Sequence, residues 1–286
     1  MAVSNRVLIT GINGFIGKAL SREIRSAGYD VWGIDFLPKG NNNILAADLL
    51  NLQEALKAAN KLPPCSVLIH AAALAHNQKP PDGETVITIN VKITENVLKA
   101  FGEKIQHMVF LSSVAVYGED RRHGPVSVND ELRPSTEYGI SKIMSENLIL
   151  KSNISNCDIL RFAPVFDENH MVDIRKRVFL PGFSSIKIII KPSPKYSLIS
   201  IQTVVKNVLK ILSKNTNGKS IYNISDSKPY NQNDLTKWFI GREISIPVIF
   251  FKPFYWLTYL LPKKYGYKIR CYYWKLFRSN IYEVDI

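Results

Sequence analysis

The chain has 286 residues, of which 46% are hydrophobic and 21% charged, a composition typical of a globular protein and not of a disordered chain or a fibre. Its three cysteines, Cys65, Cys157 and Cys271, are far apart and show no CxxC spacing, so we expect neither a disulfide framework nor a metal site. The first residues run directly into an apolar strand without the pattern of a signal peptide, and we therefore expect a cytoplasmic protein.

The formal net charge of +13 lies almost entirely in the second part of the chain. Residues 1–165 carry 17 basic and 16 acidic side chains, whereas residues 166–286 carry 20 basic and 8 acidic ones. A basic surface attracts anions of several kinds, including nucleotides, nucleic acids and anionic membranes. No nucleic-acid recognition motif accompanies the charge, so we do not expect a nucleic-acid partner.

Strand-like apolar runs alternate with helix-like segments over the first 165 residues. The runs that predict buried strands are 7–9, 31–34, 67–69, 108–111 and 159–160. The segments that predict helices are 15–24, 53–59, 90–101 and 141–150. Strand, helix and parallel strand in succession predict a doubly wound α/β sheet.

The alternation weakens after about residue 165, where prolines interrupt the chain. Residues 197–201 and 221–224 predict isolated strands around a helix at 204–212. We therefore divide the chain into a first domain, 1–165, and a smaller α+β C-terminal lobe, 166–286.

Residues 250–286 combine aromatic and basic side chains. They hold 13 aromatic residues, seven basic ones and two acidic ones. This combination suits a peripheral contact with a membrane interface. A helical cap that buries its aromatic rings on the small lobe explains the same pattern, and both interpretations stay open. The most apolar part, 248–261, contains Pro253 and is followed by Pro262, so it is too short to span a bilayer.

Three glycines, Gly11, Gly14 and Gly17, lie between the first predicted strand and the first predicted helix. They permit a tight turn and a close approach of a pyrophosphate, while the helix N-terminus offers N–H groups. Asp35 ends the second strand, where a carboxylate binds an adenosine ribose and repels a 2′-phosphate, which favours NAD over NADP. Asp48 closes the next strand and can reach an adenine edge.

Tyr138 and Lys142 are one helical turn apart, so both side chains project from one face of a helix. An ammonium near a phenol favours the phenolate, which can exchange a proton with a sugar hydroxyl or carbonyl during hydride transfer. Ser113 ends a predicted strand, and its hydroxyl can bind the same substrate oxygen. The ordered set of glycine-rich turn, Asp35, Ser113, Tyr138 and Lys142 predicts a nicotinamide-dependent enzyme.

These residues resemble the extended short-chain dehydrogenase/reductase family, in particular its NAD-dependent epimerase/dehydratase group, which acts on nucleotide sugars. The motifs that carry the resemblance are TGINGFIG at 10–17, HAAA at 70–73, INV at 89–91, SSVAVYG at 112–118 and YGISK at 138–142. The resemblance implies a Rossmann-type NAD-binding domain over 1–165 and a substrate-binding lobe over 166–286.

The resemblance also implies roles for individual residues. Its catalytic residues would be Ser113, Tyr138 and Lys142. Its cofactor contacts would be Gly11, Gly14, Phe15, Ile16, Gly17, Asp35, Asp48, Leu49, Ala71, Ala72, Ala73, Asn90, Tyr138 and Lys142. Its substrate contacts would be Ser113, Tyr138, Ala163, Lys195 and Tyr196.

Two departures from the family pattern narrow the chemistry. Dehydratases of the group have an Asp-Glu pair after the strand-end hydroxyl residue, whereas here Val114 and Ala115 follow Ser113, which argues against dehydration. Tyr196 stands where the family commonly has an Arg that binds the diphosphate. The adjacent Lys195 can supply a positive charge in its place, but it cannot make the two-pronged contact of an Arg. The basic side chains of segment 175–177 are further candidates for binding an anion. A basic turn that is simply solvated is the alternative interpretation.

We therefore expect an NAD-dependent nucleotide-sugar oxidoreductase of the UDP-sugar 4-epimerase type. A nucleotide-4-ketosugar reductase for surface polysaccharide synthesis and a non-catalytic NAD-binding module remain the alternatives. The helices at 90–101 and 141–150 correspond to those through which family members pair, so a homodimer is expected as well.

Overall fold

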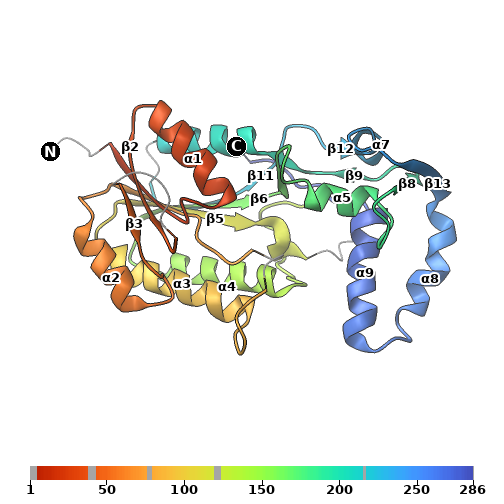
Figure 1. Ribbon diagram of the computed structural model, residues 1–286, viewed down its shortest axis with the longest axis horizontal. Helices are drawn as coiled ribbons and strands as arrows, with labels where there is room; N and C mark the ends of the chain where they lie inside the picture. The colour runs from red at the N-terminus through yellow and green to blue at the C-terminus, as the bar shows by residue number, and fades with distance from the viewer. Residues whose placement is uncertain (1–4, 38–42, 76–78, 119–123, 215–216, 286) are drawn as a thin grey trace.

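The computed structural model of the protein describes residues 5–37, 43–75, 79–118, 124–214 and 217–285 (Figure 1). Its centre is a seven-stranded sheet with the order β11-β6-β5-β4-β1-β2-β3, in which all neighbouring strands are parallel. The strands are β1 (Arg6–Thr10), β2 (Asp30–Asp35), β3 (Ile44–Ala46), β4 (Val67–His70), β5 (His107–Ser113), β6 (Asn156–Phe162) and β11 (Lys219–Ile224).

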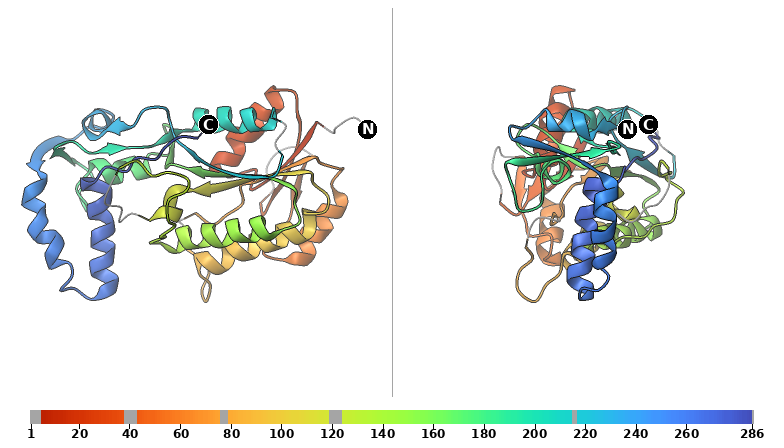
Figure 2. Two further views of the ribbon diagram at one scale, coloured as in Figure 1. Left: turned by 180° about the vertical axis from the view of Figure 1, so that it is seen from behind. Right: turned by 90° about the vertical axis from the view of Figure 1, so that its right-hand side faces the viewer.

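Helices cover both faces of this sheet (Figures 1 and 2). One face carries α2 (Leu52–Lys61), α3 (Val86–Phe101) and α4 (Glu137–Lys151), and the other carries α1 (Phe15–Ser26) and α6 (Ile201–Leu212). The prediction of a doubly wound α/β sheet is confirmed.

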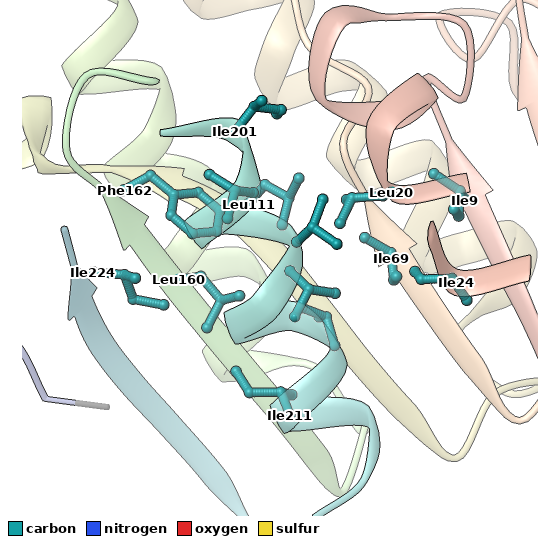
Figure 3. Close-up of a cluster of buried hydrophobic side chains, with 14 of the residues drawn as sticks. Ile9, Leu20, Ile24, Ile69, Leu111, Leu160, Phe162, Ile201, Ile211 and Ile224 are labelled. Atoms are coloured by element: carbon teal, nitrogen blue, oxygen red, sulfur yellow. The ribbon is translucent and has the colours of Figure 1, made fainter. Parts of the chain in front are cut away.

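The sheet buries apolar side chains on both faces, which explains why its strands are nearly continuous apolar runs. On the face under α1 and α6, the buried cluster includes Ile9, Leu20 and Leu160 (Figure 3). On the opposite face, Leu68 and Phe110 pack with Phe101 of α3. Each such side chain contributes about 1.5–3 kcal/mol when it is fully buried. The two clusters therefore stabilise the sheet from both of its faces.

Polar side chains define where the helices over the sheet begin. The Asn51 side chain accepts hydrogen bonds from the backbone amides at the start of α2, and Thr85 forms a capping box with Thr88 at the start of α3. Thr136 Oγ1 accepts from the amide of Gly139 at 3.1 Å, so α4 starts just before Tyr138.

The second part of the chain forms a smaller lobe from short elements. Its parallel strand pairs are β7 (Val165–Phe166) with β10 (Ile199–Ser200) and β8 (Ile186–Lys191) with β13 (Arg242–Pro247). Its antiparallel pair is β9 (Lys195–Tyr196) with β12 (Tyr230–Asn231). Its helices are α5 (Val172–Val178), α7 (Gln232–Thr236), α8 (Lys252–Leu257) and α9 (Lys263–Phe277), and the 3₁₀ turns of the chain are η1 (Val114–Tyr117) and η2 (Val248–Phe251).

The structure differs from the division at residue 165 in one respect. Strand β11 pairs with β6 and extends the first sheet, and α6 covers that sheet, so residues 201–224 belong to it. The predicted strand at 197–201 is also shorter, because Ser200 Oγ accepts from the Thr203 amide and α6 begins at Ile201. The apolar side chains of α6 pack against α1 and β6, and this packing brings the chain back to the first sheet.

The helices and the polar side chains of the described residues bear on membrane and metal binding. No helix among them combines the length and the apolar character needed to cross a bilayer. No group of three His, Cys, Asp or Glu side chains in the described part of the chain is placed to hold a metal ion.

Candidate active site

The carboxyl ends of the parallel strands gather the predicted residues at one edge of the sheet. Strand β2 ends at Asp35 and β5 ends at Ser113, while β1 and β4 lie between them and lead into the glycine-rich turn and the alanine loop. The strand order reverses direction between β1 and β4, and ligands of open α/β sheets bind at this kind of switch point.

The turn after β1 requires glycine at two positions. Gly11 has φ +69°, and a Cβ there would lie 2.8 Å from the Cα of Ala72. A Cβ on Gly17 would lie 2.1 Å from the Gly11 carbonyl oxygen. The loop of Ala71, Ala72 and Ala73 therefore packs directly on the glycine-rich turn, and only glycine permits both close approaches.

The N-terminus of α1 is open to an anion. Gly14 is its N-cap residue, no side chain of the described structure caps it, and no acidic residue lies in its first turn. The first amides of a helix, here those of Phe15, Ile16 and Gly17, have no partner within the helix, and the dipole adds positive potential. These features fit the pyrophosphate of a dinucleotide.

Asp35 lies beside this turn. Its carboxylate accepts hydrogen bonds from the amides of Asn13 at 2.9 Å and Leu37 at 3.3 Å. These bonds hold the carboxylate at the end of β2, in the position from which an acidic residue binds ribose hydroxyls. Asp48 accepts from the Leu50 amide at 2.9 Å, and the Leu49 side chain is buried in the core, so Leu49 offers its backbone rather than its side chain.

Asn90 connects the loop after β4 to helix α4. Its amide oxygen accepts from the Leu74 amide at 2.7 Å, and its nitrogen donates to the Leu74 carbonyl at 3.1 Å. The same nitrogen donates to Ser141 Oγ at 3.0 Å. Asn90 therefore holds the loop after β4 against α4, while its role as a cofactor contact stays a prediction.

Tyr138 and Lys142 lie on one face of α4, as the spacing predicts. The Lys142 ammonium is 5.5 Å from the centroid of the Tyr138 ring and donates to the Leu111 carbonyl at 2.8 Å. A Cβ on Gly139 would lie 2.5 Å from the Ala115 carbonyl oxygen, so this glycine lets α4 approach the turn that follows Ser113. Ser113 Oγ accepts from the Ala115 amide at 3.2 Å, which orients the hydroxyl.

Burial dominates the electrostatics of this pair. Burial and, to a smaller extent, the carboxylate of Asp173 together raise the pKa of Tyr138 to about 12. Burial also lowers the pKa of Lys142 to about 8. Desolvation therefore favours the neutral phenol at Tyr138, and the expectation that Lys142 favours the phenolate stays a prediction.

His70 joins the strand ends to the helices behind them. Its ring nitrogens lie 2.8 Å from Thr10 Oγ1 and 3.3 Å from Thr94 Oγ1. Burial and the charge of Lys142 lower the pKa of His70 to about 3, so the ring is neutral at physiological pH. It acts as a support of the site and not as an acid or base.

Sequence reasoning missed a buried ion pair behind the site. Arg161 of β6 donates from Nη2 to Glu146 Oε2 at 2.7 Å and from Nε to Oε1 at 3.1 Å. Ser112, next to Ser113, donates to the same carboxylate at 2.5 Å, and Tyr117 accepts from Arg161 at 2.8 Å. The signal was available, because Glu146 lies one further helical turn beyond Lys142.

Three of the predicted substrate contacts, Ala163, Lys195 and Tyr196, differ in their exposure. Ala163 is buried and donates its amide to the Ile224 carbonyl, whereas Lys195 is exposed on β9. Tyr196 is fully buried, and its hydroxyl donates to the Leu276 carbonyl at 2.9 Å. Tyr196 therefore belongs to the core of the second lobe and offers no surface to a substrate.

Two of the cations at 175–177 lie over aromatic rings, and the third, Lys176, lies 3.6 Å from an Asp173 carboxylate oxygen. The guanidinium of Arg175 lies 4.6 Å from the Phe179 ring centroid, and that of the buried Arg177 lies 5.4 Å from the Tyr196 ring centroid. Closer to the cofactor turn, His170 stacks on Phe15 with ring centroids 3.9 Å apart. The second lobe thus reaches the glycine-rich turn through His170.

Comparison with known proteins identifies the family. The model of the NAD dependent epimerase/dehydratase family matches residues 7–225. A Bacillus subtilis protein named uncharacterized UDP-glucose epimerase YtcB is 29% identical over 198 residues, which cover 59% of this chain and 59% of that protein. A putative UDP-glucose 4-epimerase of Methanocaldococcus jannaschii is 33% identical over 177 residues, covering 57% and 56%. The matched segments thus span less than two thirds of either relative.

Solved structures share the fold at lower identity. A short-chain dehydrogenase/reductase superfamily protein from Agrobacterium tumefaciens with bound NAD superposes with a TM-score of 0.70 at 22% identity, covering 85% of this chain and 86% of that one. Thermus thermophilus UDP-glucose 4-epimerase in complex with NAD gives 0.66 at 20% identity and the same coverage. With a family model that spans both the glycine-rich turn and the Tyr138 helix, this chain belongs to the NAD-dependent epimerase/dehydratase family.

Proposed function

We propose that the protein is an NAD-dependent UDP-sugar 4-epimerase that uses Ser113, Tyr138 and Lys142. The observation that carries the proposal is that Tyr138 and Lys142 share one face of α4, where Lys142 donates to the Leu111 carbonyl of β5, the strand that ends at Ser113. The names of the two relatives as UDP-glucose epimerases support the substrate class.

NAD would lie across the switch point of the sheet. Its pyrophosphate would contact the turn of Gly11, Gly14 and Gly17, and its adenosine ribose would bind Asp35, whose negative charge disfavours NADP. Asp48 and the Leu49 backbone would contact the adenine, and the loop of residues 71–73, supported by Asn90, would line the cofactor. When bound, NAD supplies a hydride acceptor that can return the hydride to the sugar.

Tyr138 would exchange the proton of the C4 hydroxyl, and Ser113 would bind the same oxygen. Lys142 would bind the cofactor ribose and keep a positive charge beside the phenol. Oxidation of the sugar requires Tyr138 as the phenolate, which accepts the C4 hydroxyl proton and becomes the phenol; the return of the hydride to the sugar is accompanied by return of this proton to the sugar oxygen. A pKa of about 12 makes this phenolate a strong base whose pKa is close to that of a sugar hydroxyl. Val114 and Ala115 offer no acid or base after Ser113, so the proposal excludes dehydration.

The diphosphate of the substrate would lie between the sheet edge and the second lobe. Lys195 is exposed and remains available to an anion, whereas Tyr196 is withdrawn from the proposal because it is buried. Ala163 would contribute only through its position at the end of β6.

The proposal is tested with purified protein, UDP-glucose and UDP-galactose. Denaturation followed by mass spectrometry first measures whether NAD is retained, and NMR then follows the C4 configuration of the sugar. Interconversion without net change in NADH supports the epimerase. An NAD-loaded protein that interconverts no UDP-hexose contradicts it. Stoichiometric NADH oxidation with a nucleotide 4-ketosugar would instead assign a reductase, such as polysaccharide synthesis requires, and cofactor binding without turnover would assign a binding module.

A homodimer through α3 and α4 is part of the proposal. Ile140, Met144 and Leu148 leave apolar surface on α4, and Met144 is 42% exposed. Such a surface is buried when two copies pair their α3 and α4 helices. Sedimentation should give twice the monomer mass, and Met144→Lys should return the protein to a monomer.

A further inference from the structure

The elements η2, α8 and α9, residues 248–277, form a projecting unit that we call the surface hairpin. Its helices pack on each other: the rings of Tyr255 and Tyr273 have centroids 4.7 Å apart, and Arg270 Nη1 donates to the Thr258 carbonyl at 3.1 Å. Figures 1 and 2 show the surface hairpin at the end of the molecule opposite the N-terminus. The site residues described above lie outside it.

The base of the surface hairpin is anchored in the protein. Trp274 and Leu276 of α9 are buried, and the Leu276 carbonyl accepts the hydrogen bond of Tyr196. Tyr267 donates to the Ser135 carbonyl at 2.7 Å. The surface hairpin is therefore a structured projection, and its position relative to the sheet is defined.

Its tip exposes large apolar side chains, in contrast to this buried base. Leu260 is 82% exposed and Trp256 is 68% exposed. The exposed apolar and aromatic side chains of the tip are Trp256, Leu257, Tyr259, Leu260, Leu261 and Tyr265. Several large apolar side chains exposed along one short turn of chain are unusual for a protein surface and mark a place of contact with a partner or a membrane.

The charge around the tip has a single sign. Residues 244–282 contain seven Lys and Arg and no Asp or Glu, and Lys263 and Lys264 directly follow the apolar tip. Protein segments that enter the head-group region of a bilayer combine Leu, Trp and Tyr with neighbouring Lys residues. Their aromatic rings lie at the interface, and their basic residues attract anionic lipids.

Other occupants fit the tip less well. A second copy of the chain would bring two surfaces of equal positive charge together. A single-stranded nucleic acid would stack its bases on aromatic rings, whereas the most exposed side chain of the tip is the aliphatic Leu260. We propose that the surface hairpin docks the protein on an anionic lipid bilayer, with its tip in the head-group region. This inference does not depend on the sugar nucleotide that the site binds.

The test is flotation of the full-length protein with vesicles. One set contains phosphatidylcholine alone, and the other contains equal parts of phosphatidylcholine and phosphatidylglycerol. We expect the protein to float with the anionic vesicles and not with the neutral ones, with binding weakened by salt. The tip variant carries Trp256→Ser, Leu260→Ser and Leu261→Ser, and the charge variant carries Lys263→Glu and Lys264→Glu. Each should bind at least about tenfold more weakly.

Ile240→Ser is the matched control, because Ile240 is fully exposed but lies outside the surface hairpin. It should float like the unchanged protein, and circular dichroism should show that all variants fold. Failure to bind anionic vesicles at low salt, or equal binding by the tip variant, overturns the proposal. Tip-dependent self-association, or tip-dependent binding to single-stranded DNA without binding to vesicles, also overturns it and assigns the surface to another partner.

Discussion

Glu146 and Arg161 form an ion pair with an Nη2–Oε2 distance of 2.7 Å, and each side chain is only 3% exposed. The pair joins helix α4, one turn beyond Lys142, to strand β6 in the sheet. Charge-assisted bonds of this two-pronged kind are directional, so they define the rotation of α4 about its own axis. The pair therefore orients the face of α4 that carries Tyr138 and Lys142.

Glu146→Gln should lower the free energy of unfolding by about 3–5 kcal/mol, because it leaves the buried Arg161 without its counter-charge. Chemical denaturation measures this loss. The control is Glu131→Gln, since Glu131 pairs with Arg133 on the surface and should cost no more than about 1 kcal/mol. Equal losses of unfolding free energy for the two substitutions would show that the buried pair stabilises the fold no more than the surface pair does.

Tyr138→Phe should lower kcat by about 10²–10⁴-fold while leaving NAD binding unchanged, because it removes the proton-exchanging hydroxyl and keeps the ring. Steady-state rates and calorimetric titration with NAD measure the two quantities. Tyr29→Phe, at the amino end of β2, is the control and should behave as the unchanged enzyme. Full activity of the Tyr138 variant would rule out the proposed mechanism.

Gly17→Ala should weaken NAD binding and destabilise the fold by about 1–3 kcal/mol, because a Cβ would lie 2.1 Å from the Gly11 carbonyl oxygen and force the turn away from α1. Thermal unfolding with and without NAD measures both effects. Gly28→Asn serves as the control, since Gly28 has φ +89° but no atom within 4 Å of its added Cβ. If NAD protects both variants equally, the close approach at Gly17 is not required for binding.

Lys142→Met should abolish activity but not stability at neutral pH. The folded pKa of Lys142, about 8, lies below its unfolded value of 10.5, so the unfolded chain binds more protons between these values. Stability from this residue therefore rises with pH through that window, by roughly 2 kcal/mol between about pH 7 and about pH 9.5.

Denaturation of both proteins at the two pH values isolates this contribution, because the other groups titrate equally in both. The difference in stability between Lys142→Met and the unchanged protein should shrink as the pH rises. A difference that is independent of pH would mean that the burial of Lys142 does not depress its pKa.

The sequence predicts the sheet and the cofactor turn well because their signals are local. The strands that end at Thr10, Asp35 and Ser113 are apolar runs, and the glycine-rich turn follows the first run directly. Tyr138 and Lys142 are also recognisable from helical spacing alone. Local patterns of this kind do not depend on distant parts of the chain.

The substrate side of the site depends on distant contacts, and the sequence predicts it poorly. Tyr196 occupies a motif position that suggests a ligand, but α9 covers it through a hydrogen bond 80 residues away. Similarly, β11 joins the first sheet by pairing with β6, about 60 residues earlier in the chain, beyond the reach of local patterns. The pKa of Tyr138 depends on burial and on Asp173 of α5, which spacing along α4 does not reveal.

The hydrogen bond from Tyr267 to Ser135 connects the surface hairpin to the start of α4. Ser135 lies next to Thr136, the residue that caps α4, and Tyr267 lies four residues into α9, about 6 Å along its axis from its first residue. A force on the tip of the surface hairpin would thus be transmitted through one side chain to the start of the helix that holds Tyr138. A displacement of the surface hairpin would therefore act on the residue that precedes the cap of α4, the helix that carries Tyr138 and Lys142.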